Sequence, residues 1–375
     1  MNNNSFKITD IKLHNFRNYT NCHISSEEKS VLLAGHNGAG KTSVLEAISY
    51  FTPGRGIRNA SPDELKHHFS DNWAINIGLS NGFETINMST GLVETKSGSK
   101  RLYKIDGENV KSSQAFLNKI KMLWLTPQID SVFLSSSQNR RKFLDRIVYN
   151  FDETHAEKIT EYEKKIRERS IILKMHILDE KWLDILESDI AKLNLEITHK
   201  RLKVIEIINN IIFSYEGLFP RTKIGLKCEV AKLIRHDVST EEIQQKYKDK
   251  RQVDKLSGRT NFGCHRSDLD LIHEESGRSF HICSTGEQKS MIIGTIIFQA
   301  MALRDQKLPL PILLLDEIMA HLDDDKRQGL IDTIRQMNIQ SFITSTHTEF
   351  WSEINFPAKF YEVKNAGISE INRVE

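Results

Sequence analysis

The sequence is poor in cysteine and proline and has no long apolar run. Its four cysteines are scattered without a CxxC pair, which argues against a zinc site and against a disulfide framework. No segment approaches the roughly 18 apolar residues of a membrane-spanning helix, and the first residues, MNNNSFK, lack a basic region followed by an apolar stretch. We therefore expect reduced thiols, no membrane partner and a cytoplasmic location.

An excess of charge of one sign is also missing, because 52 basic and 50 acidic residues leave a net charge of +2. Any DNA contact must therefore rest on local patches. The stretch 246–259 carries six basic residues against two acidic ones, enough to contact phosphates, although a solvated helix face is the commoner reason for such a stretch. Arg55 with Arg58 and Arg140 with Arg141 are competing candidates. Backbone contact without base readout is the DNA hypothesis.

Strand patterns dominate the first part of the chain. Residues 6–13 alternate apolar and polar side chains, and 30–35 form a short apolar run typical of a buried strand. Three strand-like runs follow between 73 and 105, and Asp106-Gly107 supplies a tight turn, which predicts an antiparallel meander. With 39% hydrophobic and 27% charged residues, the composition is that of a soluble globular protein.

The pattern changes to helical spacing from about 138 to 217, where glycine is scarce and proline absent. Strand signals return after Phe262, at 311–316 and 340–345. We therefore expect an α/β fold with a mixed sheet and an inserted, mainly α-helical second lobe. The expected limits are 1–115 and 261–375 for the two halves of the α/β unit and 116–260 for the helical lobe.

A phosphate-binding loop is the firmest motif. Residues 35–42 match G-x-x-x-x-G-K-[ST] between an apolar strand and a helix, where backbone N–H groups and the helix dipole favour phosphate. Lys41 is expected to reach the β- and γ-phosphates of ATP, and Thr42 to bind Mg²⁺. A plain glycine-rich turn is the alternative, but by composition the pattern arises in about one chain in a hundred. The residues expected to bind nucleotide here are Gly35, His36, Asn37, Gly38, Ala39, Gly40, Lys41, Thr42 and Ser43.

An apolar strand, 312–315, ends in two carboxylates, Asp316 and Glu317. In a P-loop ATPase the first acid holds Mg²⁺ and the second orients or deprotonates the attacking water, so Glu317 and Lys41 are the expected catalytic residues. Alone, such a strand is as often structural, and its pairing with the P-loop favours the ATPase interpretation. His347 follows the strand 340–345 and can reach a γ-phosphate, although a surface histidine is the ordinary alternative.

A third motif, Cys283-Ser-Thr-Gly-Glu-Gln-Lys289, is similar to the LSGGQ signature of ABC-type ATPases. Ser284 and Gly286 are kept, whereas Thr and Glu replace one Gly and the usual Gln. A serine hydroxyl and amides at a helix N-terminus form an anion site, and in the ABC class this site serves ATP bound to another subunit. An ordinary helix N-cap is the alternative, and the same serine can be both an N-cap and part of an anion site.

Four further blocks, at 13–19, 53–58, 140–145 and 258–268, occur in the order of one family. Together with the ATPase motifs they cover nearly the whole chain, which resembles the RecF family of bacterial DNA replication and repair ATPases related to the heads of SMC proteins. The resemblance implies an ATPase head with a helical second lobe, ATP-dependent dimerisation and DNA binding near single-strand/double-strand junctions. It also implies partnership with RecR and RecO in loading the RecA recombinase.

The resemblance also gives roles to single residues. Arg17, after the first strand, is expected to contact the nucleotide, and its alternative is a surface arginine. Gln128 stands where the family is associated with an acidic residue, and it looks like the Q-loop glutamine that touches Mg²⁺ and senses the γ-phosphate of ABC ATPases.

The function expected from these motifs is that of a weak ATPase that closes two heads on DNA. One alternative is the nucleotide-binding subunit of an ABC transporter, which the long helical stretch between P-loop and signature disfavours. A P-loop kinase is the other, and it would leave Ser284 and its neighbours unexplained.

Overall fold

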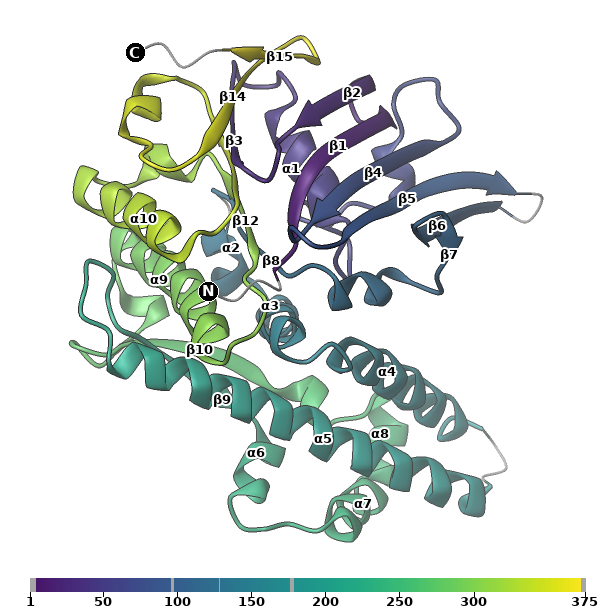
Figure 1. Ribbon diagram of the computed structural model, residues 1–375. Helices are drawn as coiled ribbons and strands as arrows, with labels where there is room; N and C mark the ends of the chain where they lie inside the picture. Colours follow the sequence, from purple (N-terminus) through teal and green to yellow (C-terminus); the bar gives the residue numbers. More distant parts are fainter. Residues whose placement is uncertain (1–4, 96–97, 128, 176–178, 372–375) are drawn as a thin grey trace. The chain divides into compact units, whose positions relative to one another are not determined.

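The computed structural model describes residues 5–95, 98–127, 129–175 and 179–371, which form two compact units (Figure 1). The head unit comprises Met1–Ile129, Gly217–Phe219 and Leu303–Glu375, and the helical unit comprises Asp130–Glu216 and Pro220–Ala302. Residues 261–302 therefore group with the helices, whereas the sequence assigned them to the α/β half. The limits expected at 116 and 260 stay predictions.

The first sheet of the head unit is antiparallel throughout, in the order β2-β1-β4-β5-β6-β7. Asp106 and Gly107, both with positive φ, make the two-residue turn between the last two strands, so the predicted meander is confirmed. The strands are β1 (Lys7–Phe16), β2 (Tyr19–Ser25), β4 (Trp73–Ser80), β5 (Thr85–Thr95), β6 (Gly98–Ile105) and β7 (Glu108–Asn109).

The second sheet has the order β15-β14-β3-β13-β12-β8, with every neighbouring pair parallel except β14 and β15. All residues of β3, β12 and β13 are buried, which is typical of the central strands of a parallel sheet. Because parallel strands end at one edge, the segments after these strands meet there. The strands are β3 (Ser30–Ala34), β8 (Met122–Leu125), β12 (Ile312–Asp316), β13 (Ser341–Ser345), β14 (Ala358–Lys364) and β15 (Gly367–Ile371).

Helix α1 (Lys41–Ser49) packs against strands of both sheets, and its apolar side chains join theirs in one core. The other α-helix lying wholly within the described head unit is α10 (Asp324–Met337). Asp323 caps its N-terminus by accepting the N–H of Lys326 at 2.9 Å. The head unit also contains the 3₁₀ turns η1 (Pro62–Leu65), η2 (Ser113–Asn118), η5 (Ile318–His321) and η6 (Glu349–Glu353).

The helical unit is built around α5 (Glu180–Phe213), which contacts helices α3, α4, α6 and α7. Its buried residues Ile190, Leu193 and Ile197 recur at helical spacing, so the predicted long helix is confirmed. None of the helices within the described ranges is long and apolar enough to span a membrane. The other α-helices are α2 (Ile129–Leu134), α3 (Ser137–Phe151), α4 (His155–Ile172), α6 (Glu229–Ile234), α7 (Thr240–Asp249), α8 (Arg251–Ser257) and α9 (Thr285–Asp305).

A small antiparallel sheet of order β11-β10-β9 completes the helical unit. Helix α3 contacts β10 and helix α5 contacts β9, so the small sheet packs against the helices of this unit. Its strands are β9 (Thr222–Lys227), β10 (Asp268–His273) and β11 (Arg278–Ser279), and the adjacent 3₁₀ turns are η3 (Cys264–Arg266) and η4 (Phe280–Ile282).

The block at 258–268 contributes a neutral histidine to the core of the helical unit. His265 Nε2 lies 3.0 Å from the Thr260 carbonyl, which only accepts, so Nε2 carries the proton and Nδ1 accepts from the Tyr162 hydroxyl at 2.8 Å. Burial lowers the pKa of His265 from 6.5 to about 4. Gly263, at φ 128, is required beside this pair, since a Cβ there would lie 2.2 Å from the Tyr162 hydroxyl oxygen.

This histidine predicts a loss of stability in mild acid. The unfolded chain protonates His265 near pH 6.5 and the folded chain only near pH 4, so its contribution is present above pH 6.5 and falls as pH drops toward 4. We expect urea unfolding to show about 2 kcal/mol less stability at pH 5 than at pH 7.5 from this group. His265→Gln should flatten that loss and the exposed His23→Gln should not. An unchanged pH profile in His265→Gln would contradict the assignment.

Candidate phosphate-binding site

The loop between β3 and α1 has the backbone that its glycines predict. Gly40, the N-cap of α1, has φ 121, and a Cβ there would lie 2.5 Å from the Tyr19 hydroxyl oxygen. A Cβ on Gly35 would lie 2.2 Å from the carbonyl oxygen of Val363. Both positions therefore require glycine, because the loop is pressed against β14 on one side and the start of β2 on the other.

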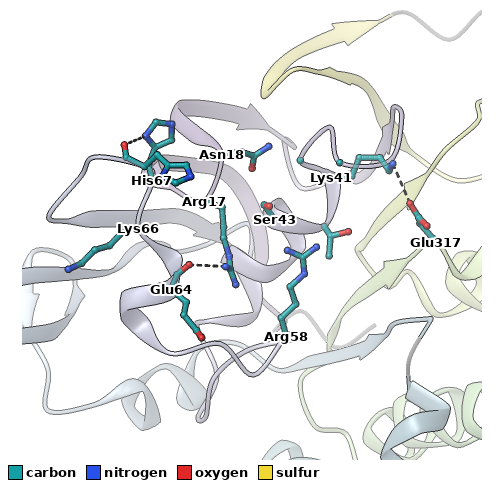
Figure 2. Close-up of a pocket in the computed structure, with 13 residues that line it drawn as sticks. Arg17, Asn18, Lys41, Ser43, Arg58, Glu64, Lys66, His67 and Glu317 are labelled. Atoms are coloured by element: carbon teal, nitrogen blue, oxygen red, sulfur yellow. Dashed lines mark hydrogen bonds and ion pairs between the residues drawn. The ribbon is translucent and has the colours of Figure 1, made fainter.

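Lys41 is the first residue of α1, and its side chain is only 3% exposed. Its ammonium donates to the carbonyls of Gly35 at 2.6 Å and His36 at 3.1 Å, and it lies 3.3 Å from Glu317 Oε1 (Figure 2). The Lys41 ammonium therefore lies over the P-loop, at the same end of the pocket as Glu317. The structure brings together the two residues that the sequence singled out for catalysis.

Asp316 ends β12 beside the P-loop. Its Oδ1 accepts from Thr42 Oγ1 at 2.9 Å and from Thr344 Oγ1, on β13, at 2.8 Å. Burial raises the pKa of this carboxyl, and the two hydroxyl donors oppose that shift. Thr42 and Asp316, 274 positions apart in the sequence, therefore share one hydrogen bond because parallel strands end at the same edge.

Glu317 has an unusual backbone conformation for a residue with a side chain. Its φ of 53° lies in the left-handed region, and its N–H donates to Thr344 Oγ1 at 3.0 Å. Such strained conformations persist where the surroundings fix them, and they cluster at functional sites. The left-handed turn separates the two acids, so that Asp316 stays buried while the Glu317 side chain, 30% exposed, enters the pocket.

A buried carboxylate, Glu46, was not found by sequence reasoning. It lies on α1 with its side chain 0% exposed, and it accepts from Arg17 Nε at 2.9 Å and Nη2 at 2.6 Å. Arg58 Nη1 lies 3.7 Å from the same carboxylate. The pKa of Arg17 is raised, first by the hydrogen bond to Glu46. The signal available in the sequence was an acid on the inward, apolar face of an otherwise amphipathic helix.

Lys41, Thr42, Glu317 and Arg17 are among the residues that line a pocket of about 640 Å³ in the head unit. The volume lies within the range of small-molecule sites, and its basic wall suits a polyanion. Arg17 and Asn18 lie between the P-loop end and a second wall formed by the loop after η1 (Figure 2). The lining residues are Arg17, Asn18, Gly38, Gly40, Lys41, Thr42, Ser43, Arg58, Glu64, Lys66, His67, His68 and Glu317.

Several residues predicted for the nucleotide site are not among the residues that line this pocket, including Gly35, His36, Asn37 and Ala39 of the loop itself. His347 is exposed after β13 and is not among the pocket residues, although the Ser345 hydroxyl donates to its carbonyl. Gln128 lies outside the described residues. Ser284 and Gly286 belong to the helical unit, at the start of α9.

Ser284 forms a reciprocal cap at the N-terminus of α9. Its N–H donates to Glu287 Oε2 at 2.7 Å, and the N–H of Glu287 donates to Ser284 Oγ at 3.3 Å. The serine is exposed, and a Cβ on Gly286 would meet nothing within 4 Å. Ser284 is therefore a helix N-cap whose solvent-facing side is uncovered within the described part of this chain. This is compatible with an anion site that serves ATP bound to another subunit.

The basic candidates for DNA contact differ in their availability. Arg140 is engaged inside the helical unit, where Nε and Nη2 pair with Asp268 at 2.6 and 2.8 Å. Arg141 donates to the Ser267 carbonyl at 2.7 Å, so this pair is a structural feature of the unit. Within 246–259, Lys248 and Arg251 form ion pairs with Asp184, whereas Lys255 and Arg259 are exposed.

Glu46 gives a prediction for stability and binding together. Glu46→Gln should lower the free energy of unfolding by about 2 kcal/mol, less than for a fully buried pair because Arg17 is 23% exposed. Because Arg17 is expected to contact the nucleotide, the loss of its orientation should also weaken ATP binding. The double variant Glu46→Gln/Arg17→Met should regain stability in urea but not ATP affinity. Recovery of both would contradict an orienting role, and exposed Glu108→Gln is the control.

The comparison with known proteins decides the family. The model of the RecF/RecN/SMC N-terminal domain matches residues 7–369. This chain belongs to the RecF family. The "DNA replication and repair protein RecF" of Rickettsia prowazekii (strain Madrid E) is 37% identical over 343 residues, which cover 90% of this chain and 94% of the relative. That of Rickettsia typhi is 36% identical over 346 residues, covering 91% and 95%.

A solved structure titled as the recombination mediator protein RecF-ATP in the RecFOR pathway has the same fold. Its TM-score to this chain is 0.86 at 21% sequence identity, with 98% of both chains covered. The predicted RecF resemblance and the predicted α/β fold, an ABC-type ATPase head with an additional helical part, are confirmed. RecF-family membership over this length also disfavours the transporter subunit and the P-loop kinase.

Proposed function

We propose that this RecF-family chain is an ATP-dependent DNA-binding protein of recombinational repair and replication restart. ATP binding closes two heads on DNA at single-strand gaps or junctions, and weak hydrolysis releases them, which helps to load the recombinase. The carrying observation is the 2.9 Å hydrogen bond between Thr42 and Asp316, which joins the phosphate loop to the acidic strand. The relatives in Rickettsia are DNA replication and repair proteins by name, which supports the cellular role.

ATP is the ligand that the pocket suits. Lys41, Arg17 and Arg58 place three cationic groups along it, and the loop amides at the start of α1 add the helix dipole. The two close glycine contacts, at Gly35 and Gly40, are those of a loop whose backbone itself forms the cradle. The structure of similar fold is that of RecF-ATP, which supports the same ligand here.

Mg²⁺ fits the oxygen donors of this site. Thr42 Oγ1 and Asp316 Oδ1 are hard ligands 2.9 Å apart, and Asp316 carries a buried carboxyl whose ionised form a cation would favour. When bound, the ion neutralises charge that develops on the β- and γ-phosphates. Ser43, next in the helix, also lines the pocket and carries a hydroxyl at this end of the P-loop.

Hydrolysis is assigned to Glu317. Its carboxylate lies in the pocket beside Lys41, where it orients a water for addition to the γ-phosphorus and accepts a proton from it while the bond to the β-phosphate oxygen breaks. Asp316 is assigned to Mg²⁺ instead, because it is buried and its Oδ1 lies 2.9 Å from Thr42 Oγ1, whereas the Glu317 side chain lines the pocket. A weak ATPase is proposed, since hydrolysis here serves release and not turnover.

Dimerisation completes the site in this proposal. The exposed Ser284 cap of α9, in a second copy of the chain, contacts the γ-phosphate held by the first copy, so one chain holds half of each site. DNA lies against exposed basic residues such as Lys255 and Arg259, with backbone contacts alone. RecR- and RecO-type mediators are the proposed protein partners. His347 and Gln128 remain proposed γ-phosphate and Mg²⁺ contacts.

The deciding experiment measures ATPase rate, mass in solution and DNA retention together, with and without gapped duplex DNA. The proposal expects a monomer without nucleotide to become a dimer with ATP and to be retained on gapped DNA, with faster phosphate release. A chain that hydrolyses ATP at the same rate and stays monomeric with DNA present would contradict it.

Ser284→Arg tests the shared site. The large arginine side chain should prevent the two heads from closing on each other, so ATP-dependent dimerisation and DNA retention should be lost. The monomer should bind ATP as before, because Ser284 is not among the residues of the pocket. The control is Ser276→Arg, on the turn between β10 and β11. Dimerisation of Ser284→Arg at wild-type ATP concentrations would rule out the clamp.

A further inference from the structure

The pocket has a second wall, away from the P-loop, that the ATPase motifs do not use. Lys66, His67 and His68 form it, and Figure 2 shows Lys66 and His67 on the opposite side of the pocket from Lys41 and Glu317. Because the P-loop fixes the phosphates at one end, the ribose and base of a nucleotide extend toward the other. This step rests on the proposed binding of ATP.

The wall is held in place by backbone hydrogen bonds to the end of β1. The N–H of His67 donates to the Asn15 carbonyl at 2.8 Å, and the N–H of Arg17 donates to the Leu65 carbonyl at 2.7 Å. A β-bridge also joins Phe16 to Lys66. The loop is therefore organised before any ligand arrives, which lowers the entropy cost of binding.

The same region stores backbone strain. Asn15, Arg17 and Phe69 have φ of 48°, 54° and 66°. A positive φ is uncommon for a bulky residue, and the strain at Phe69 is not offset by burial because its side chain is fully exposed. Strain of this kind is typical of ligand-binding loops. The centroid of the Phe69 ring lies 5.7 Å from that of His68, and of these two neighbouring planar side chains His68 lines the pocket.

Hydrogen bonding fixes the tautomer of neutral His67. Its Nδ1 lies 2.9 Å from the carbonyl oxygen of His68, and a carbonyl can only accept, so Nδ1 carries the proton. In the neutral ring, Nε2 is then an acceptor. Adenine presents an amino donor at the position where guanine presents a carbonyl oxygen. An acceptor at this wall therefore favours adenine.

We infer that His67 and His68 form the base subsite of the nucleotide pocket. The imidazole of His68 stacks on the purine, and Nε2 of His67 accepts from the adenine amino group. The P-loop supplies phosphate affinity without regard to the base, and this loop supplies the preference for ATP over GTP.

The test compares the binding of ATP, GTP and inorganic tripolyphosphate, each with Mg²⁺, to the full chain by calorimetry. His68→Ala should weaken ATP binding about tenfold, as loss of a base-stacking contact does, and leave tripolyphosphate affinity unchanged. His68→Phe, which keeps a planar ring, should restore ATP affinity. His67→Ala should reduce the ATP over GTP preference. His23→Ala, on β2 and outside the pocket residues, is the matched control.

Two results separate failure of this inference from failure of the proposed function. Wild-type ATP affinity in His68→Ala, or an equal loss for ATP and tripolyphosphate, would overturn the base subsite while leaving ATP binding in place. If His68→Ala alters only DNA retention, the loop is a DNA contact and the subsite is again overturned. A wild-type chain that binds neither ATP nor tripolyphosphate would refute the proposed function and this inference together.

Discussion

Glu317→Gln is expected to slow ATP hydrolysis by about two to four orders of magnitude, the usual contribution of a positioned general base. The amide keeps the shape of the side chain and leaves the left-handed backbone at 317 unchanged, since the N–H contact to Thr344 does not involve the carboxylate. Lys41 loses an ion-pair partner at 3.3 Å, so its ammonium becomes more available to phosphate. ATP affinity should therefore be kept or increased.

The consequence in solution is a trapped dimer. With hydrolysis slowed, Glu317→Gln should remain dimeric and DNA-bound in ATP long after the wild type has dissociated. Phosphate release and mass in solution measure the two halves of this prediction. The variant staying monomeric at saturating ATP would refute ATP-driven closure, and unchanged hydrolysis would remove Glu317 from the catalytic role. Glu108→Gln, on the exposed strand β7, is the control for loss of a negative charge.

Lys41→Met is expected to weaken ATP binding by roughly a hundredfold, because a charge-assisted contact to phosphate is lost in a buried setting. Methionine retains the apolar stem of a side chain that is 3% exposed, so folding should be little affected. ATP-dependent DNA retention should fall to the level seen without nucleotide, while nucleotide-independent DNA binding persists.

Comparing Lys41→Met with Glu317→Gln separates the effect of losing nucleotide binding from the effect of losing hydrolysis. Both variants hydrolyse poorly, but Glu317→Gln holds ATP and Lys41→Met does not, so only Glu317→Gln should be retained on DNA. Lys29→Met, at an exposed position of the same unit, controls for removal of a positive charge. Retention of Lys41→Met on DNA with ATP at the wild-type level would break the link between nucleotide and clamp.

Local patterns predicted much of the fold and of the phosphate site. The alternation in 6–13 became β1, the runs at 312–315 and 340–345 became central strands, and the P-loop lies between strand and helix. These elements can be predicted from the sequence because apolar periodicity and glycine placement are short-range properties of a chain. The adjacency of Thr42 and Asp316 was not predicted from the sequence; in the structure it follows from parallel strands that end at a common edge.

Partner choice between distant residues could not be predicted in the same way. Arg140 pairs with Asp268 and so lies inside the helical unit instead of facing solvent as a DNA candidate. Glu46 is a buried ion-pair partner of Arg17, but the sequence shows it only as an acidic residue in an amphipathic helix. Both outcomes depend on which side chains are desolvated together, which is a property of packing and not of composition.

The sequence by itself determined that this chain has a phosphate loop, an acidic strand and a signature-like helix start in the order of the RecF family. Those features are encoded in residue type and spacing, and each is formed within a few residues. Only the tertiary structure decided that Glu317 enters the pocket while Asp316 stays buried, that Glu46 orients Arg17, and that His67 and His68 form the far wall. These depend on strand register, on a left-handed backbone turn and on burial, which are set when the whole unit packs.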